Sequence, residues 1–147
     1  MRTIALRFAN SFAPKEGTIA AHQAIIDCFG FVWYGKLGTC VSSSTIKSIL
    51  ENDSPRILLI HSGASGRYWA YVDRIQTCLP SEDQIPAYYR DRAADFKTWF
   101  RVIRFENAPK DILSKCFVAS SGTALSQASR HSMSPYFIID YKDETIT

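Results

Sequence analysis

The sequence lacks any long hydrophobic run, and no stretch approaches the ~18 apolar residues that a membrane-spanning helix needs. The first eight residues are too few and too charged to form the core of a signal peptide, so we expect a cytoplasmic protein with no membrane partner. Seven glycines and six prolines in 147 residues exclude collagen-like and low-complexity material. With 46% hydrophobic and 21% charged residues, the composition is that of a globular domain. We expect one domain over residues 3–141, followed by a short acidic tail at 142–147.

Sequence motifs that mark nucleotide, metal and hydrolase sites are also missing. The chain contains neither G-x-x-x-x-G-K-[ST] nor G-x-G-x-x-G, and neither H-E-x-x-H nor G-x-S-x-G. His22, His61 and His131 are far apart, and none of them neighbours a second metal ligand in the sequence. The glycine-rich stretch between His61 and Arg67 joins two expected strands, so we interpret it as a hairpin turn rather than a phosphate loop. We therefore expect no metal and no cofactor.

The four cysteines form no C-x-x-C pair, which argues against a zinc ribbon or a thioredoxin-like site. Each lies beside apolar residues, so we expect buried free thiols at Cys28, Cys40, Cys78 and Cys116. The net charge is only +3 and permits a nucleic-acid partner without requiring one. The basic excess lies in residues 56–104, which hold eight Lys or Arg against five Asp or Glu.

Hydrophobic periodicity and turn residues divide the chain into short alternating elements. We expect strands at 3–8, 31–34, 56–61, 67–78, 96–105 and 135–141, and residues 117–119 are a candidate for one more short strand. We expect helices at 18–29 and 44–52, one or two helical turns at 109–115, and a loop or weak helix at 120–134. This order predicts an α+β fold in which about six mixed or antiparallel strands curl into a small barrel with two or three helices outside.

Aromatic residues make up 13% of the chain, and some fall where a core is not expected. Trp33 and Tyr34 end a predicted strand, and Tyr88 and Tyr89 lie in a long polar segment. Aromatics at strand ends and in loops are poor core candidates and good platforms for stacking bases, which contributes ~1–3 kcal/mol per base. An aromatic cage also suits a methylated group. Burial of Trp33 in the core is the alternative.

Four segments of the chain resemble segments of YTH domains and the related EVE domains, and they follow one another in the same order as in those domains. The clearest is R-I-L-L-I-H-S-G-A-S-G-R-Y-W-A-Y-V at 56–72, a strand, a turn with Ser-Gly and a basic residue, and a second strand. The others are L-R-F-A-N-S at 6–11, G-F-V-W at 30–33 and F-K-T-W-F-R-V at 96–102. Together they span most of residues 3–141 and imply a PUA-like barrel of the kind that binds modified bases in RNA or DNA.

The resemblance also implies roles for individual residues. Trp33 would be one wall of an aromatic cage, and the second wall would come from Tyr88 and Tyr89, where YTH domains have a tryptophan. Asn10 would bind the base edge, and Ser62 would lie at the pocket floor. The full set of implied ligand-binding residues is Asn10, Ser11, Trp33, Tyr34, Ser62, Tyr88 and Tyr89. Phosphate contacts would fall to Lys36, Arg67 and Arg130, which flank the same loops.

The favoured function is a non-catalytic reader that binds DNA or RNA through a modified base, as a sensor in a defence or mobile-element system. A separate effector protein would then act after recognition. One alternative is an ASCH-like hydrolase or ribonuclease acting on RNA or a nucleoside derivative, because ASCH domains share the barrel. Asp73, His131 or Lys36 would then supply its chemistry. The other alternative is a protein-binding module that uses the barrel as a scaffold.

Overall fold

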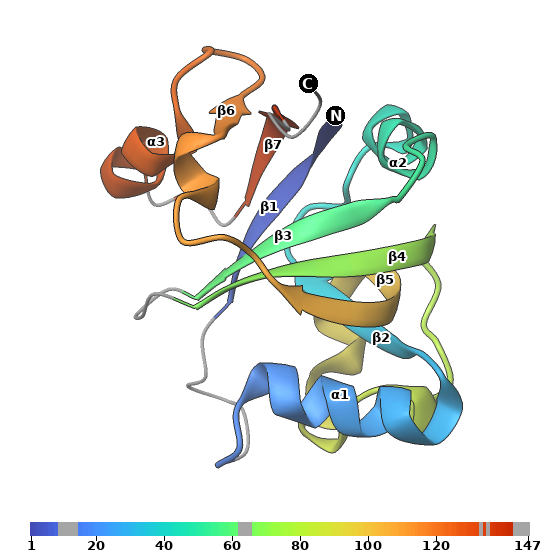
Figure 1. The fold of residues 1–147 in the computed structure, drawn as a ribbon. Helices are drawn as coiled ribbons and strands as arrows, with labels where there is room; N and C mark the ends of the chain where they lie inside the picture. Colours follow the sequence, from blue (N-terminus) through green and yellow to red (C-terminus); the bar gives the residue numbers. More distant parts are fainter. Residues whose placement is uncertain (9–14, 62–65, 133, 135, 143–147) are drawn as a thin grey trace.

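The computed structural model describes residues 1–8, 15–61, 66–132, 134 and 136–142 (Figure 1). This part of the chain forms seven strands, three α-helices and three 3₁₀ helices. The strands are β1 (Arg2–Phe8), β2 (Val32–Leu37), β3 (Arg56–His61), β4 (Arg67–Gln76), β5 (Phe96–Asn107), β6 (Cys116–Val118) and β7 (Tyr136–Tyr141). The helices are α1 (Thr18–Phe29), α2 (Ser43–Leu50), η1 (Glu82–Gln84), η2 (Ala87–Asp95), η3 (Ile112–Ser114) and α3 (Leu125–His131).

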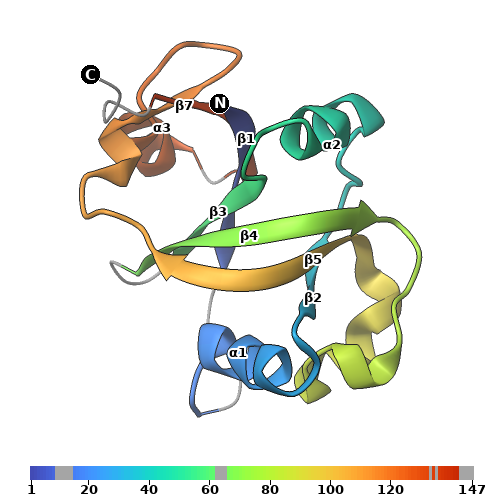
Figure 2. The same ribbon diagram turned by 45° about the vertical axis from the view of Figure 1, so that its right-hand side comes forward.

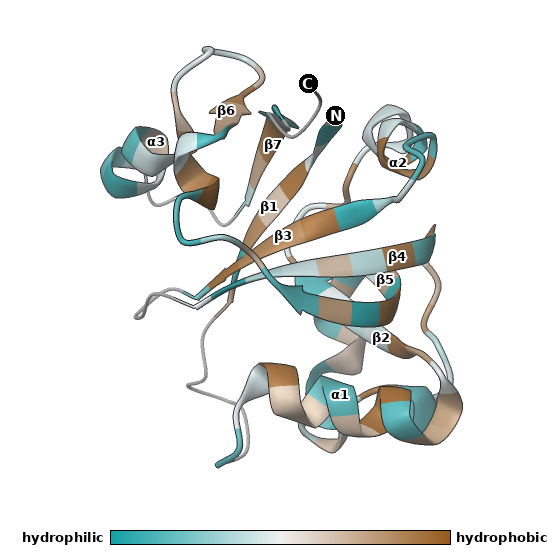
Figure 3. Ribbon diagram, in the orientation of Figure 1, coloured by the Kyte–Doolittle hydropathy of each residue, from teal (hydrophilic) through white to brown (hydrophobic). Residues whose placement is uncertain are grey.

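All seven strands belong to one mixed sheet in the order β2-β5-β4-β3-β1-β7-β6. Only β1 and β3 run parallel, and the other neighbours are antiparallel. These two central strands are buried on both faces, and hydrophobic residues run along most of their length (Figure 3). The predicted α+β class is confirmed.

The sheet is strongly curled, because side chains on one of its faces pack against one another from strands at both ends of the sheet. The inner core gathers residues from β2 near one edge and from β1 and β7 near the other, closed by α1 and α2. Its buried members are Ile4, Leu6, Phe8, Val32, Tyr34, Val41, Ile49, Ile57, Leu59, Ala70, Val72, Phe100 and Val102. The Lys36 ammonium of β2 lies 4.4 Å from the ring centre of Tyr136 in β7, although these strands are not neighbours in the sheet.

The predicted closed barrel of about six strands is nevertheless wrong. The sheet has seven strands in the described residues, and its two outer strands, β2 and β6, are not paired with each other. The physical reason is that β7 uses one edge for β1 and the other for β6. With both edges hydrogen-bonded, β7 cannot pair with β2, and the sheet stays open.

Two further layers cover the outer face of the sheet. At one end, α3 and η3 pack over β1, β3, β6 and β7 around a second core (Figure 2). At the other end, η1 and η2 cover Trp33 of β2 and Trp99 of β5. None of the helices in the described part of the chain is long and apolar enough to span a membrane.

Most element predictions are confirmed, and the exceptions have identifiable causes. The helix at 18–29 and the strand at 56–61 have the predicted bounds. The long polar segment that holds Tyr88 and Tyr89, for which we expected no helix or strand, forms two 3₁₀ helices. The strand expected at 31–34 continues through Gly35 to Leu37 because β5 pairs with it throughout. The predicted acidic tail lies outside the described residues except for Lys142.

A β-bulge interrupts the alternation of side chains along β4. Simple alternation puts Ile75 on the same face as Trp69 and Tyr71. The register with β5 shifts between Tyr71 and Val72 and again between Val72 and Arg74. The shift turns Ile75 into the inner core with Val72, whereas Tyr71 packs on the outer face.

The prediction of four buried thiols holds for one cysteine only. Cys116 is buried in the second core, and burial raises the pKa of its thiol to about 12. Cys28, Cys40 and Cys78 are exposed. An apolar neighbour in the sequence does not ensure burial, because adjacent residues in a helix or strand point in different directions.

Gly35 provides a test of how closely β2 and β5 pack. A Cβ atom at Gly35 would lie 2.7 Å from two ring carbons of Phe96 and 3.0 Å from a ring carbon of Trp99. We expect Gly35→Ala to lower the free energy of unfolding by about 1–3 kcal/mol, measured by urea denaturation. Adding Phe96→Leu should relieve the clash, so the double variant should lose less than the sum of the single losses. Strict additivity would contradict this packing argument.

Candidate functional site

The aromatics singled out from the sequence come together in the structure, but most of them are buried. Trp33, Tyr34 and Tyr89 are only 4%, 5% and 6% exposed, and Tyr88 is half-buried. The expectation that they are poor core candidates is therefore wrong for three of the four. Two features hide them: β2 continues past Trp33 and Tyr34, and η2 folds back over the sheet.

Trp33 and Tyr34 point to opposite faces of β2, and Tyr89 links the two sides. Trp33 packs with Ile85, Tyr89 and Trp99 beneath η1 and η2. Its indole Nε1 donates a hydrogen bond to Oε1 of Gln84 over 3.2 Å. The ring centre of Tyr89 lies 6.0 Å from that of Trp99 and 6.5 Å from that of Tyr34.

On the inner side, a histidine of α1 completes what we call the tyrosine–histidine cluster: His22, Tyr34, Tyr88 and Tyr89. The imidazole centre lies 4.9 Å from the ring centre of Tyr34, 5.2 Å from Tyr89 and 6.4 Å from Tyr88. Because η2 brings in two of these tyrosines, the cluster joins segments that are more than sixty residues apart. Burial raises the pKa of all three phenols, so they remain neutral hydrogen-bonding groups.

His22 is fully buried and has one unsatisfied nitrogen. Its Nδ1 lies 2.8 Å from the carbonyl oxygen of Thr18 and must be the protonated nitrogen, because a carbonyl only accepts. Burial lowers the pKa of His22 to about 4, so the ring is neutral at pH 7. Nε2 is then an acceptor, and it has no hydrogen-bond partner in the described part of the chain. Buried polar atoms without a partner are rare and call for an explanation.

The predicted polar residues Asn10, Ser11 and Ser62 fall outside the described residues. Their points of attachment are nevertheless fixed. Segment 9–14 follows Phe8 and segment 62–65 follows His61, and these two residues are register partners at the ends of the parallel strands β1 and β3. Their rings meet edge to face with centres 5.0 Å apart.

The three predicted phosphate contacts differ in accessibility. Arg130 is exposed at the end of α3, where its Nε donates to the carbonyl of Ser126 over 2.9 Å. Arg67 is half-buried at the start of β4, next to the strand ends. Lys36 is only 6% exposed, and its ammonium donates to the carbonyls of Leu37 and Thr39 at 3.2 and 2.7 Å. Desolvation lowers the pKa of Lys36.

Sequence reasoning missed His22 as a site residue. The available signal was its position on the apolar face of α1, one turn after Thr18 and between Ile19 and Ile26. A polar residue at such a position is more often satisfied within the core, and only the tertiary structure shows that Nε2 is not.

Two of the residues suggested for hydrolysis, Asp73 and Lys36, already form hydrogen bonds within the fold. Asp73 accepts two hydrogen bonds from Arg101 at 2.8 and 3.0 Å, on the outer side of the sheet. His131 is exposed at the end of α3. No group of three or more His, Cys, Asp or Glu gathers within metal-binding reach in the described ranges.

The comparison with protein families decides the classification. Residues 4–145 match the Pua-like family, which is almost the whole chain. This chain is a member of the PUA-like family. Comparisons with curated proteins and with solved structures gave no match. Membership agrees with a curled, mixed sheet and is consistent with nucleic-acid binding.

The buried imidazole predicts an acid-sensitive step in stability. The ordinary pKa of histidine is 6.5, and that of His22 in the folded PUA-like domain is about 4. The unfolded chain therefore takes up the proton more readily. The contribution of neutral His22 to the free energy of unfolding should be fully present above about pH 6.5. The free energy of unfolding should then fall by roughly 3 kcal/mol as the pH drops towards 4. Urea denaturation of the wild type and His22→Gln at several pH values measures this difference.

The matched control is His131→Gln, which removes an exposed histidine and should leave the pH profile of stability unchanged. Carboxylates such as Asp140, whose pKa is lowered by Arg2, contribute equally to all three proteins and cancel. Parallel profiles for the wild type and His22→Gln would contradict the assignment of a neutral buried imidazole.

Proposed function

We propose that this PUA-like domain is a non-catalytic reader that binds DNA or RNA through a modified base, with the tyrosine–histidine cluster as its pocket. One observation carries the proposal: the unpaired Nε2 of His22 lies among three tyrosine rings. A planar, partly apolar ligand with an N–H group would satisfy this acceptor and stack on the rings. A nucleobase has this chemistry.

The base would enter at Tyr88, the one half-buried member of the cluster. Tyr88 is hydrogen-bonded to Thr18 and Tyr89, so its ring would have to give up these bonds to cover an entering base. Tyr34 and Tyr89 would form the inner walls, with Trp33 supporting Tyr89 from the other side of β2. A methyl group on the base would add contact with these faces at little cost in desolvation.

The remaining contacts are proposed from the strand ends. Asn10 and Ser11 follow β1, and Ser62 follows β3, so the side chains of these segments are the candidates for reading the polar edge of the base. We assign phosphate contacts to Arg67 and Arg130. We leave Lys36 out, because its ammonium already donates to two carbonyls inside the fold.

Binding to short fluorescent oligonucleotides tests the proposal directly. The panel holds matched DNA and RNA with unmodified, N6-methyladenine, 5-methylcytosine and 5-hydroxymethylcytosine bases, at two salt concentrations. We expect one modified member to bind more tightly at both. Tyr88→Leu should reduce that preference about tenfold, because stacking contributes ~1–3 kcal/mol per base. Fluorescence polarisation measures both effects.

The control for Tyr88→Leu is Tyr71→Leu, which removes another half-buried tyrosine on the outer face of the sheet. It should keep the preference for the modified base. Equal weak binding to every oligonucleotide that disappears with salt would mean attraction by charge alone and would contradict a reader. Turnover of an oligonucleotide by the wild type would instead support the hydrolase alternative.

Arg67 gives a separate prediction about the phosphate backbone. Arg67→Gln should weaken binding to all oligonucleotides alike and reduce the slope of log affinity against log salt by about 1. Arg2→Gln is the matched control, because Arg2 lies at the opposite end of β1 and is paired with Asp140. A change in base preference without a change in the salt slope would mean that Arg67 contacts the base rather than phosphate.

A further inference from the structure

Basic side chains form a row across the outer side of the sheet, at the end where β1 and β3 finish and β4 begins. Arg7 of β1 and Arg67 of β4 are register partners of the same residue, Ile60 of β3. Because Ile60 lies in the second core, both arginines start from the outer face, with Cα atoms about 10 Å apart across two strand spacings. Arg67 reaches the connection after β5, where its Nη1 donates to the carbonyl of Lys110 over 3.4 Å (Figures 1 and 2). Beyond Arg7, Arg130 lies on the last turn of α3. We call Arg130, Arg7, Arg67 and Lys110 the basic band.

The charge of the basic band is +4, because its four cations form no ion pair with a carboxylate in the described part of the chain. Two carboxylates lie next to it in the chain or the sheet, Asp111 and Glu106, and each is paired with a cation outside the band, at 3.6 and 3.7 Å. The residues attached to this end of the sheet that lie outside the described part are all uncharged: 9–14, 62–65, 133 and 135. Since the whole protein has a charge of only +3, its positive charge is concentrated here.

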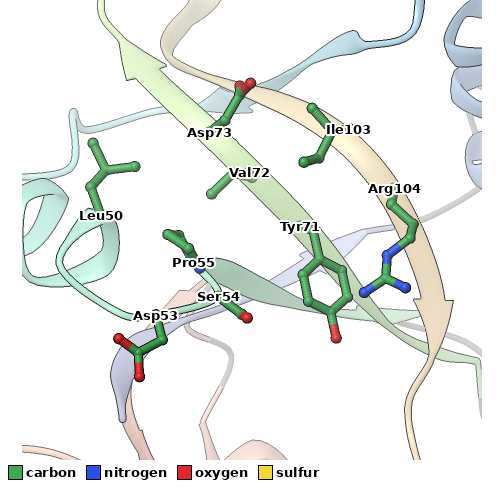
Figure 4. A pocket seen from close by; sticks show the side chains of 9 residues that line it. All are labelled: Leu50, Asp53, Ser54, Pro55, Tyr71, Val72, Asp73, Ile103 and Arg104. Carbon is green, nitrogen blue, oxygen red and sulfur yellow. The ribbon is translucent and has the colours of Figure 1, made fainter.

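A hollow of about 460 Å³ elsewhere on the outer side lacks this selectivity (Figure 4). It lies where the turn after α2 meets β4 and β5. Three carboxylates and three guanidinium groups line it or contact its lining: Asp53, Asp73, Glu106, Arg56, Arg101 and Arg104. These charges cancel, so they select no ligand there. The basic band, in contrast, attracts a phosphodiester backbone, which carries one negative charge per nucleotide.

Arg7 holds the Arg130 end of the band in place. Its half-buried guanidinium donates from Nε to the carbonyl of Ser134 over 3.0 Å. From Nη2 it donates to the carbonyls of Ser129 and Ser132 at 2.6 and 2.8 Å. The Ser129 carbonyl belongs to the last turn of α3, so Arg7 caps the C-terminal end of this helix. A lysine ammonium is a compact point charge and cannot reproduce this planar fork.

We infer that the phosphate backbone of a DNA or RNA strand crosses the outer side of the sheet along the basic band. Lys110 is then a further phosphate contact beside Arg67 and Arg130, and Arg7 is the positioning residue of Arg130. The inference rests on nucleic-acid binding by the proposed reader and extends it beyond the bound base. The same strand ends carry the segments proposed to read the base edge, so a strand that continues past the base reaches the band.

The salt dependence of binding to unmodified oligonucleotides tests the path. The probes are fluorescent single-stranded oligothymidylate and oligouridylate of equal length, titrated by fluorescence polarisation between about 50 and 200 mM salt. Lys110→Gln should reduce the slope of log affinity against log salt by about 0.7–1, as expected for one phosphate contact. Lys97→Gln, which changes an exposed lysine at the opposite end of β5, should leave the slope unchanged. Both probes should respond alike, because they share the phosphodiester.

The positioning role of Arg7 has its own test. Arg7→Lys keeps the charge but removes the fork, so it should reduce the salt slope by as much as Arg130→Gln does. The double variant should reduce it no further, because Arg7 acts through Arg130. Arg2→Lys, at the other end of β1, is the matched control and should keep the wild-type slope. Far-UV circular dichroism shows whether each variant is folded. A wild-type slope in folded Arg7→Lys would overturn the positioning role.

Two results would overturn the path of the strand. One is an unchanged slope in Lys110→Gln, or a change confined to oligouridylate, which would indicate a ribose contact. The other is equally tight binding of polyglutamate with the same response to the variants, because charge alone would then explain the attraction. Absence of binding by both oligonucleotides at about 50 mM salt would overturn the path and the reader together. Loss of modified-base preference with the expected slopes would overturn the reader alone.

Discussion

The inner faces of six strands pack against one another, and the positions of the other elements follow from this shared core. Burying one continuous apolar face forces the sheet to curl until β2 approaches β7. α1 then closes one opening and α2 another, with Ile26 and Ile49 among the side chains that fill the interior. His22 is buried for the same reason: its helix cannot deliver its isoleucines to the core without carrying the imidazole inside as well.

The local elements could be predicted because their signals are local. The apolar run at β3, the helical spacing in α1 and the left-handed Gly30 that ends this helix at φ 85° can each be recognised within a few residues. The open sheet could not be predicted in the same way. It depends on a three-residue strand, β6, occupying the free edge of β7. The short strand at 117–119 is a candidate from the sequence, but its pairing with β7 is a long-range contact that no local pattern predicts.

The sequence indicates which aromatic residues come together, but it does not predict that most of them are buried. The sequence places Trp33 and Tyr34 near a turn and Tyr88 and Tyr89 in a polar segment, and the fold does bring them together. Their burial depends on Gly35, whose missing side chain makes room for the ring of Phe96 and lets η2 lie close to the sheet. A glycine reads as a strand end in the sequence, whereas in the structure it is a packing position inside the strand.

The free-energy cost of burying an unpaired nitrogen at His22 makes the tyrosine–histidine cluster a better candidate site than the tryptophans beside it. Trp33 packs fully, and its truncation would cost about 3–5 kcal/mol, a large part of the ~5–15 kcal/mol that stabilises a typical domain. If a Trp33 truncation abolished nucleic-acid binding, the loss would report the destabilised fold rather than a contact between Trp33 and the ligand. The unpaired Nε2 of His22 costs about 1–3 kcal/mol in the free protein. A leucine at this position would avoid that cost. In the proposed reader, a ligand N–H that donates to this nitrogen would recover the cost, so a deficit in folding would become a contribution to affinity.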